Sequence, residues 1–151
     1  MKGERILFGV SVVVLVVIAA FIIFGSVQSA AVAFTDQGDH VGNLTFEQLR
    51  GMGADDAVRA IRGRRLTAAT WALGYAILFG WVALGPYRRR ERWAWWVLLA
   101  SLIIPQVISI ARLLFIGTTV GTLPSAMLLG FGLLGLLAGA PRFFLRKADL
   151  V

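Results

Sequence analysis

One apolar segment carries most of the polar side chains that could do chemistry in this chain. Residues 93–116 form a run long enough to cross a bilayer, yet polar groups interrupt it. At about 100° per residue, the interrupting positions fall within roughly 140° of one helical face. They are Ser101, Pro105, Gln106, Ser109 and Arg112. Polar groups at membrane depth are costly, so such a face usually meets a partner helix or a wet cavity.

A pocket on this face could bind an anionic amphiphile. Arg112 lies about 6 Å inside the end of the run, and its guanidinium could hold a lipid phosphate or a carboxylate. Alternatively, the Arg112 side chain reaches the membrane interface and pairs with an acidic residue of the polar segment 26–65. Pro105 removes a backbone hydrogen bond and favours a kink. Tyr75, in another apolar run, could bond to Gln106 as part of a pocket or as a simple link between helices. The candidate ligand-binding residues are Arg112, Ser109, Gln106, Tyr75 and Ser101.

Signatures of catalysis and of metal binding are weak or absent. The chain has no cysteine, which excludes disulfides, thiolate metal sites and dithiol redox chemistry. Asp36, Asp39 and His40 could be metal ligands, but a lone histidine in a turn-rich stretch is better explained by solvated turn residues. There is no persuasive nucleophile–base pair, no H-E-x-x-H motif and no Walker loop. We therefore expect no metal and no cofactor, and we expect a non-enzymatic role, with an enzyme as the third hypothesis.

Composition places the chain among integral membrane proteins. Hydrophobic residues make up 58% of its 151 residues, and the mean hydropathy is +0.80. We expect an all-α, four-helix transmembrane bundle forming a single domain over residues 1–151. The predicted spans are 6–24, 66–86, 93–116 and 123–140. Residues 26–65 are then a partly helical extracytoplasmic loop.

The first apolar run has two interpretations. Residues 31–33 read Ala-Val-Ala and could be the cleavage site of a signal peptide. The run at 6–24 is longer than the usual core of a signal peptide, so we expect a retained helix.

Two short helices are predicted within the loop. Thr45 and Gln48 form a capping-box pattern that opens the first one. The second begins at Asp55 and ends near Arg65, with acids at its start and arginines at its end, as the helix dipole favours. Its apolar face predicts that it lies on the membrane surface or caps the bundle.

Small residues recur along the second and fourth spans at helical spacing. Such stripes let a neighbouring helix approach closely, although alanine is also simply common in membrane helices. The candidate packing residues are Ala69, Ala72, Ala76, Gly80 and Ala83 in the second span, and Ala126, Gly130, Gly135 and Gly139 in the fourth.

The distribution of charge predicts the orientation. Nine of the 15 Lys and Arg residues lie in the N-terminal segment, the turn at 87–92 and the C-terminal tail, against three acids. The segment 26–65 is neutral, with five arginines and five acids. The positive-inside rule therefore places both termini in the cytoplasm of a multi-pass cell-membrane protein. The net charge of +7 is explained by topology rather than by nucleic acid. The turn at 87–92 could also attract anionic lipid headgroups.

The stretch Arg89-Arg90-Glu91-Arg92-Trp93-Ala94-Trp95-Trp96 at the mouth of a span resembles small, uncharacterised bacterial four-span membrane proteins. The resemblance covers about residues 45–116, and it implies a four-span fold without implying an activity.

Two functions are compatible with these features. The small-residue stripes favour an accessory or assembly subunit, which packs against itself or against a larger membrane complex and is surrounded by membrane lipids. The polar face of the third span favours a binder or carrier of an anionic lipid or another amphiphile.

Overall fold

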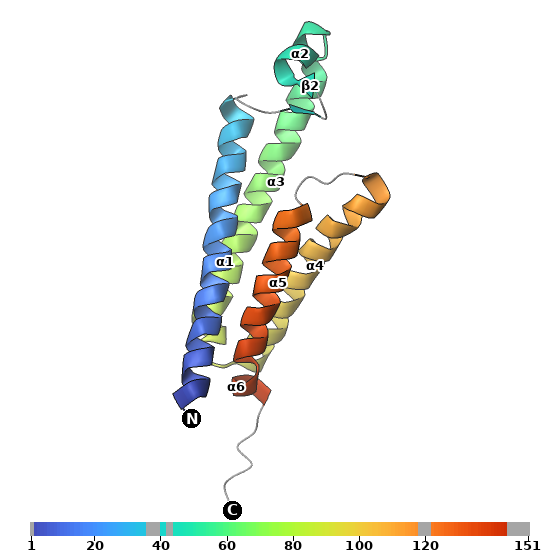
Figure 1. Ribbon diagram of the computed structural model, residues 1–151. Coiled ribbons are helices and arrows are strands. Elements are labelled where there is room, and N and C mark those ends of the chain that lie inside the picture. Colours follow the sequence, from blue (N-terminus) through green and yellow to red (C-terminus); the bar gives the residue numbers. More distant parts are fainter. Residues whose placement is uncertain (1, 36–39, 42–43, 118–121, 145–151) are drawn as a thin grey trace, which may run out of the picture. The chain divides into compact units, whose positions relative to one another are not determined.

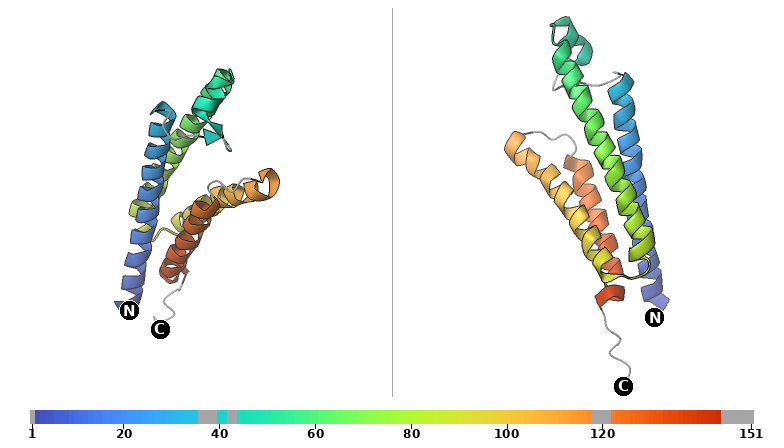
Figure 2. Two further views of the ribbon diagram at one scale, coloured as in Figure 1. Left: turned by 45° about the horizontal axis from the view of Figure 1, so that its top comes forward. Right: turned by 180° about the vertical axis from the view of Figure 1, so that it is seen from behind.

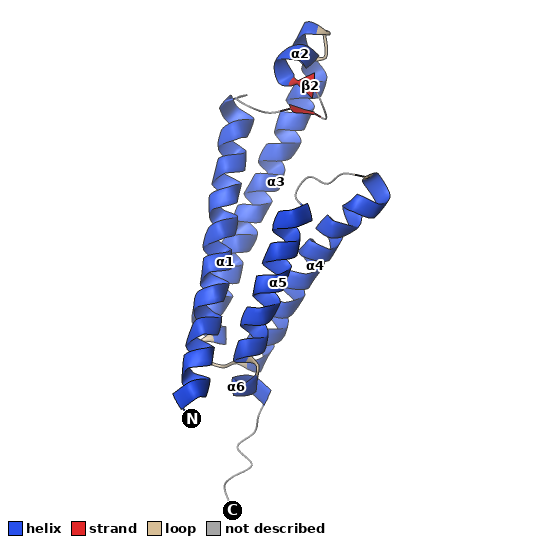
Figure 3. Ribbon diagram, viewed as in Figure 1, coloured by secondary structure: helices blue, strands red, loops and turns tan. Residues whose placement is uncertain are grey.

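The computed structural model describes residues 2–35, 40–41, 44–117 and 122–144, and nearly all of them are helical (Figures 1 and 3). The elements in chain order are α1 (Lys2–Thr35), β1 (His40–Val41), β2 (Leu44–Thr45), α2 (Phe46–Gly51), α3 (Asp55–Val82), η1 (Ala83–Tyr87), α4 (Arg92–Ile116), α5 (Thr122–Gly139) and α6 (Pro141–Phe144). The predicted all-α class is confirmed.

Four helices among the described residues are long and apolar enough to cross a membrane. They cover Gly3–Thr35, Asp55–Tyr87, Arg92–Phe115 and Thr122–Phe144, and each contains one of the four predicted spans at least in large part. Large apolar side chains such as Phe21, Leu114 and Leu134 stay exposed on them. These properties are compatible with a multi-pass membrane protein.

The chain divides into two units. The first contains Met1–Ala19 and Leu78–Val151, and the second contains Ala20–Ile77. The long helices α1 and α3 each contribute residues to both units.

In the first unit, α4 and α5 pack as an antiparallel pair. Near the start of α4, the indole of Trp95 donates to the carbonyl of Leu136. Near its other end, the Ser109 hydroxyl accepts from Ser125 at 2.8 Å. The start of α4 therefore lies beside the end of α5, and the end of α4 lies beside the start of α5. The two helices lie side by side in both views of Figure 2. Towards its Ile116 end α4 curves away from α5 (Figure 2), and Pro105 lies inside this helix. A proline inside a helix explains such a curve, because it removes a backbone hydrogen bond.

A π-helical turn, η1, connects α3 to the basic turn that precedes α4. Pro86 lies inside this turn. In an α-helix its ring would clash with the carbonyl four residues earlier, which favours the wider π-helical turn. Both Pro86 and Tyr87 are buried. The chain then reverses through Arg90, which adopts a left-handed backbone with φ of 64°. Arg90 N–H donates to the Tyr87 carbonyl, and Glu91 N–H donates to the Pro86 carbonyl.

In the second unit, the short elements between the long helices start with an antiparallel pairing of β1 with β2. Thr45 then caps α2: its side chain accepts from Gln48 N–H, while the Gln48 side chain accepts from Thr45 N–H. The predicted capping box is confirmed.

The prediction of a separate short helix at Asp55–Arg65 is wrong, because α3 is continuous from Asp55 to Val82. The sequence around Arg65 contains no proline, and Gly63 alone costs a helix only about 1 kcal/mol, which is too little to end it. Likewise α1 runs to Thr35, well beyond the apolar run that ends at Phe24. Alanine-rich sequence without proline between Ser26 and Ala33 favours this extension.

Candidate functional site

The polar face predicted on α4 is used mainly for contacts within the chain. The Ser101 hydroxyl donates to the carbonyl of Leu98, one turn earlier on the same helix, at 3.0 Å. Gln106 is buried, and Ser109 bonds to Ser125 of α5. Arg112, by contrast, is exposed near the end of α4. The structure therefore directs part of the predicted face towards α5 and leaves its arginine at the surface.

Two other groupings of residues considered from the sequence are not tested by the described contacts. Tyr75 lies on α3 in the second unit, whereas Gln106 lies in the first, so the hydrogen bond between them stays a prediction. Asp36 and Asp39 lie outside the described residues. In the part of the chain that the structure describes, no group of three His, Asp or Glu residues could hold a metal ion.

The small residues of α3 and the first residue of η1 are turned inward at alternate positions of the predicted stripe. Ala69, Ala76 and Ala83 are buried, while Ala72 and Gly80 are partly buried. A Cβ added at Gly80 would lie 3.3 Å from the Cβ of Ala19 on α1. Close approach to another helix of the same chain is therefore one use of this stripe.

The predicted small residues of α5 divide between two faces. Gly135 and Gly139 are buried, and a Cβ at Gly135 would lie 2.9 Å from Cγ1 of Val14. Ala126 and Gly130 are exposed, and a Cβ at Gly130 would meet nothing within 4 Å. Sequence reasoning missed Gly132, which packs directly against the Leu102 side chain. Its position three residues before Gly135 was an available signal.

A buried hydrogen bond links α1 to the π-helical turn next to Gly139. Ser11 Oγ and Tyr87 Oη lie 2.6 Å apart, and both residues are fully buried. A Cβ at Gly139 would collide with the Tyr87 hydroxyl and would come within 2.7 Å of Ser11 Oγ. Any side chain at position 139 would therefore clash with these two residues, so only glycine fits. The Tyr87 ring is therefore held inside the first unit.

Aromatic rings pack against Tyr87, one of the two partners in this hydrogen bond, and continue through Phe143 and Phe144 to two tryptophans. Tyr87 stacks on Phe8 with ring centroids 5.6 Å apart and contacts Phe143 at 4.8 Å. Trp95 meets Trp96 and Phe144 edge to face, at 4.8 and 5.1 Å. We call Phe8, Tyr87, Trp95, Trp96, Phe143 and Phe144 the aromatic cluster. Edge-to-face and offset ring pairs add about 0.5–1.5 kcal/mol beyond the area that they bury.

Arginines border the aromatic cluster. The Arg92 Nε–H donates to the carbonyl of Phe143 at 3.1 Å. The guanidinium of Arg90 lies over the Phe8 ring, 5.7 Å from its centroid. Arg142 Nε lies 3.9 Å from a carboxylate oxygen of Glu4. This part of the first unit thus joins a partly buried aromatic cluster to basic side chains.

A second set of arginine contacts joins α1 to α3 in the second unit. The Arg62 guanidinium donates to the carbonyls of Ala33 and Phe34, at 2.7 and 2.9 Å, and Arg65 donates to the Ser29 hydroxyl. The last carbonyls of a helix lack partners within the helix and carry the negative end of its dipole, so a guanidinium is well suited to them. We call these five residues the α1–α3 clasp. Sequence reasoning treated Arg62 only as a dipole partner of its own helix.

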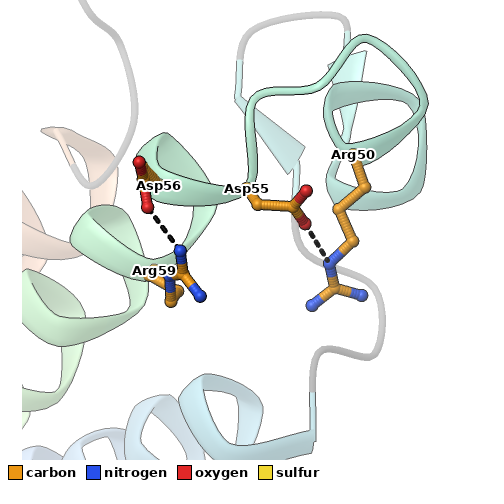
Figure 4. Close-up of polar contacts among 4 residues, drawn as sticks. All are labelled: Arg50, Asp55, Asp56 and Arg59. Carbon is orange, nitrogen blue, oxygen red and sulfur yellow. Dashed lines mark hydrogen bonds and ion pairs between the residues drawn. The ribbon is translucent and has the colours of Figure 1, made fainter.

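Two exposed ion pairs lie near the start of α3 (Figure 4). Arg50 Nε lies 3.9 Å from Asp55, which links α2 to the first turn of α3. Asp56 pairs with Arg59 one turn further along the same helix. Exposed pairs of this kind contribute little to stability, and they carry no chemistry by themselves.

Comparison of the chain with protein-family models, with curated proteins and with solved structures finds no match. The class that the described residues define is therefore an all-α chain with four candidate membrane-spanning helices.

Proposed function

We propose that this chain is a multi-pass protein of the cytoplasmic membrane with both termini in the cytoplasm. The concentration of Lys and Arg in the N-terminal segment, the 87–92 turn and the C-terminal tail supports this orientation. The neutral segment 26–65 would then lie on the opposite side of the membrane.

Within the membrane, we propose a non-enzymatic role as an accessory or assembly subunit. Buried polar groups already serve contacts within the chain: Ser11 bonds to Tyr87, and Ser125 bonds to Ser109. Such bonds hold helices together, and each is typically worth about 1 kcal/mol or less in a membrane.

One observation carries the proposal of a partner chain. On α5, Ala126 and Gly130 are exposed, on the face turned away from the buried Gly135 and Gly139. Leu137 lies two turns beyond Gly130 on the same exposed face. Small residues beside leucines leave a shallow surface on which another helix can pack closely. The partner is a second copy of this chain or a helix of a larger membrane complex.

Photo-crosslinking in native membranes tests this proposal. A benzophenone amino acid is placed at Leu137, on the proposed face, and separately at Phe131, which is equally accessible but about 100° around the helix from Gly130. We expect adducts of defined mass from position 137 and few from position 131. Mass spectrometry of the adduct identifies the partner as this chain or another protein.

A filling substitution provides the decisive comparison. Gly130→Leu adds a side chain that meets nothing within the chain, so the fold should persist while the close approach is blocked. The adduct from position 137 should then fall at least severalfold, whereas Phe131→Leu should leave it unchanged. Equal crosslinking from both positions, or adducts that survive Gly130→Leu, would refute the proposed contact.

Binding of an anionic amphiphile at Arg112 is the second candidate. The exposure of Arg112 favours it, because an outward guanidinium can meet a headgroup. The hydroxyl groups of Ser101 and Ser109 take part in hydrogen bonds within the chain. Loss of a co-purifying amphiphile in Arg112→Ala would support this second function.

A further inference from the structure

The turn between η1 and α4 presents three consecutive arginines at the surface of the first unit. Arg88, Arg89 and Arg90 are all exposed. Arg89 Nε lies 3.7 Å from Glu91 Oε1. The other carboxylate oxygen of Glu91 accepts a hydrogen bond from the indole N–H of Trp93 at 2.6 Å. In the described part of the chain, Arg88 and Arg90 have no carboxylate partner. The turn thus has a local excess of positive charge that its own acid does not neutralise.

The backbone of Arg90 is costly for the residue that occupies it. A non-glycine residue with φ near +60° is sterically disfavoured, and glycine or asparagine is the usual occupant. The left-handed backbone at position 90 suits glycine, yet the residue there is an arginine with a long, charged side chain. Its guanidinium lies over Phe8, and a ring face engages a guanidinium without using its N–H donors. The side chain is therefore oriented by the aromatic cluster while its donors stay available.

Exposed tryptophans follow the turn directly. Trp93 and Trp96 are about half exposed at the start of α4. Tryptophan favours the headgroup level of a bilayer, where its ring is apolar and its N–H is polar. These arginines and tryptophans all lie within residues 88–96. They are therefore close enough along the chain to meet the same interfacial layer.

We propose that this turn is a binding surface for anionic phospholipid headgroups, with Arg88 and Arg90 as the principal phosphate contacts. Positive charge, oriented guanidinium donors and interfacial indoles together match a phosphate next to acyl chains. The occupant is a lipid of the surrounding leaflet, and the surface is separate from the α5 face proposed for a partner chain. Either proposal can fail without the other.

The test is native mass spectrometry of the intact chain in a neutral detergent. The protein is offered phosphatidylglycerol and phosphatidylcholine with the same acyl chains at equal concentration, and the ratio of bound lipids is measured. We expect the wild type to prefer phosphatidylglycerol. A basic residue near a membrane surface is worth about 1 kcal/mol, so Arg88→Gln and Arg90→Gly should each lower that preference about fivefold.

Arg90→Gly separates the lipid role from a structural one, because it relieves the backbone cost while removing the cation. Arg90→Lys should retain most of the preference, since the charge remains. Arg64→Gln is the matched control, because it removes one exposed arginine from α3 in the second unit. It should leave the ratio unchanged. An equal loss in Arg64→Gln and Arg90→Gly would show a net-charge effect and refute the site. An unchanged ratio in both Arg90→Gly and Arg88→Gln, or no preference in the wild type, would also refute it.

Discussion

The aromatic cluster of the first unit and the α1–α3 clasp of the second hold helices together in different ways. The cluster packs rings against Tyr87, which is hydrogen-bonded to Ser11, and requires a glycine at position 139. The clasp uses the guanidinium of Arg62 on the last carbonyls of α1, partly in contact with solvent. The first depends on shape, and the second depends on charge and hydrogen bonding.

This difference has a physical consequence. A close-packed contact tolerates almost no added volume, whereas a long arginine can adjust its position to keep its acceptors. Substitutions that add a single methyl group should therefore distinguish the two regions more clearly than substitutions that remove charge. The predictions below test this ordering.

Gly139→Ala should have the largest effect. The added Cβ collides with the Tyr87 hydroxyl, so either the ring or α5 must shift. Overpacking of this kind typically costs about 2 kcal/mol, despite the better helix propensity of alanine. Unfolding in mixed detergent, followed by circular dichroism, measures the loss.

Gly130→Ala is the matched control on the same helix. Its added Cβ meets nothing within 4 Å, so stability should be unchanged or higher by up to about 1 kcal/mol. Equal effects of the two variants would show that Gly139 is not packed as described.

Arg62→Met should loosen the end of α1. It keeps an apolar stem but removes the donors to Ala33 and Phe34, leaving these carbonyls to water. We expect a loss of about 1 kcal/mol, seen as roughly fivefold faster amide exchange in the last turns of α1. Hydrogen exchange with mass spectrometry gives this local readout. Arg64→Met changes an exposed arginine on another face of α3 and should leave the exchange rate as it is. If Arg64→Met accelerates exchange equally, the clasp is not the cause.

The sequence predicts the elements better than it predicts these contacts. Apolar length identifies all four candidate spans, and the Thr45–Gln48 spacing identifies the cap of α2, because both signals are local. The inward position of Tyr87 depends on the π-helical turn at Pro86 and on a serine 76 residues away. Arg62 likewise acts on carbonyls about 28 residues away in the chain. No local pattern encodes such distant partners.

The candidate site shows the same limit. The polar face of α4 is recognisable from spacing alone, but the pairing of Ser109 with Ser125 requires the register between α4 and α5. That register is set by packing, as with Leu102 against Gly132, and not by the type of either serine. Sequence reasoning therefore finds the polar face without finding its partners.

Tyr87→Phe should have a smaller effect than either change above. It preserves the ring contacts with Phe8 and Phe143 and removes only the hydroxyl bonded to Ser11. Hydrogen bonds between membrane helices average about 0.6 kcal/mol, so we expect a loss of that size. Ser11→Ala should cost a similar amount, and the double variant should cost less than the two losses together, because both remove one bond. Strict additivity in detergent unfolding would contradict a direct Ser11–Tyr87 interaction.

Arg59→Gln should have the smallest effect and a different dependence on salt. Arg59 and Asp56 are largely exposed, so water and ions screen their attraction. We expect a loss of about 0.5 kcal/mol or less at low ionic strength, disappearing near 1 M salt. The Gly139→Ala loss should persist at both salt concentrations, because it arises from volume. Amide exchange in the first turns of α3, compared at the two salt concentrations, measures the effect. A loss above 1 kcal/mol that salt does not reduce would show that Arg59 packs against the chain, and it would weaken the contrast between a region held by shape and one held by charge.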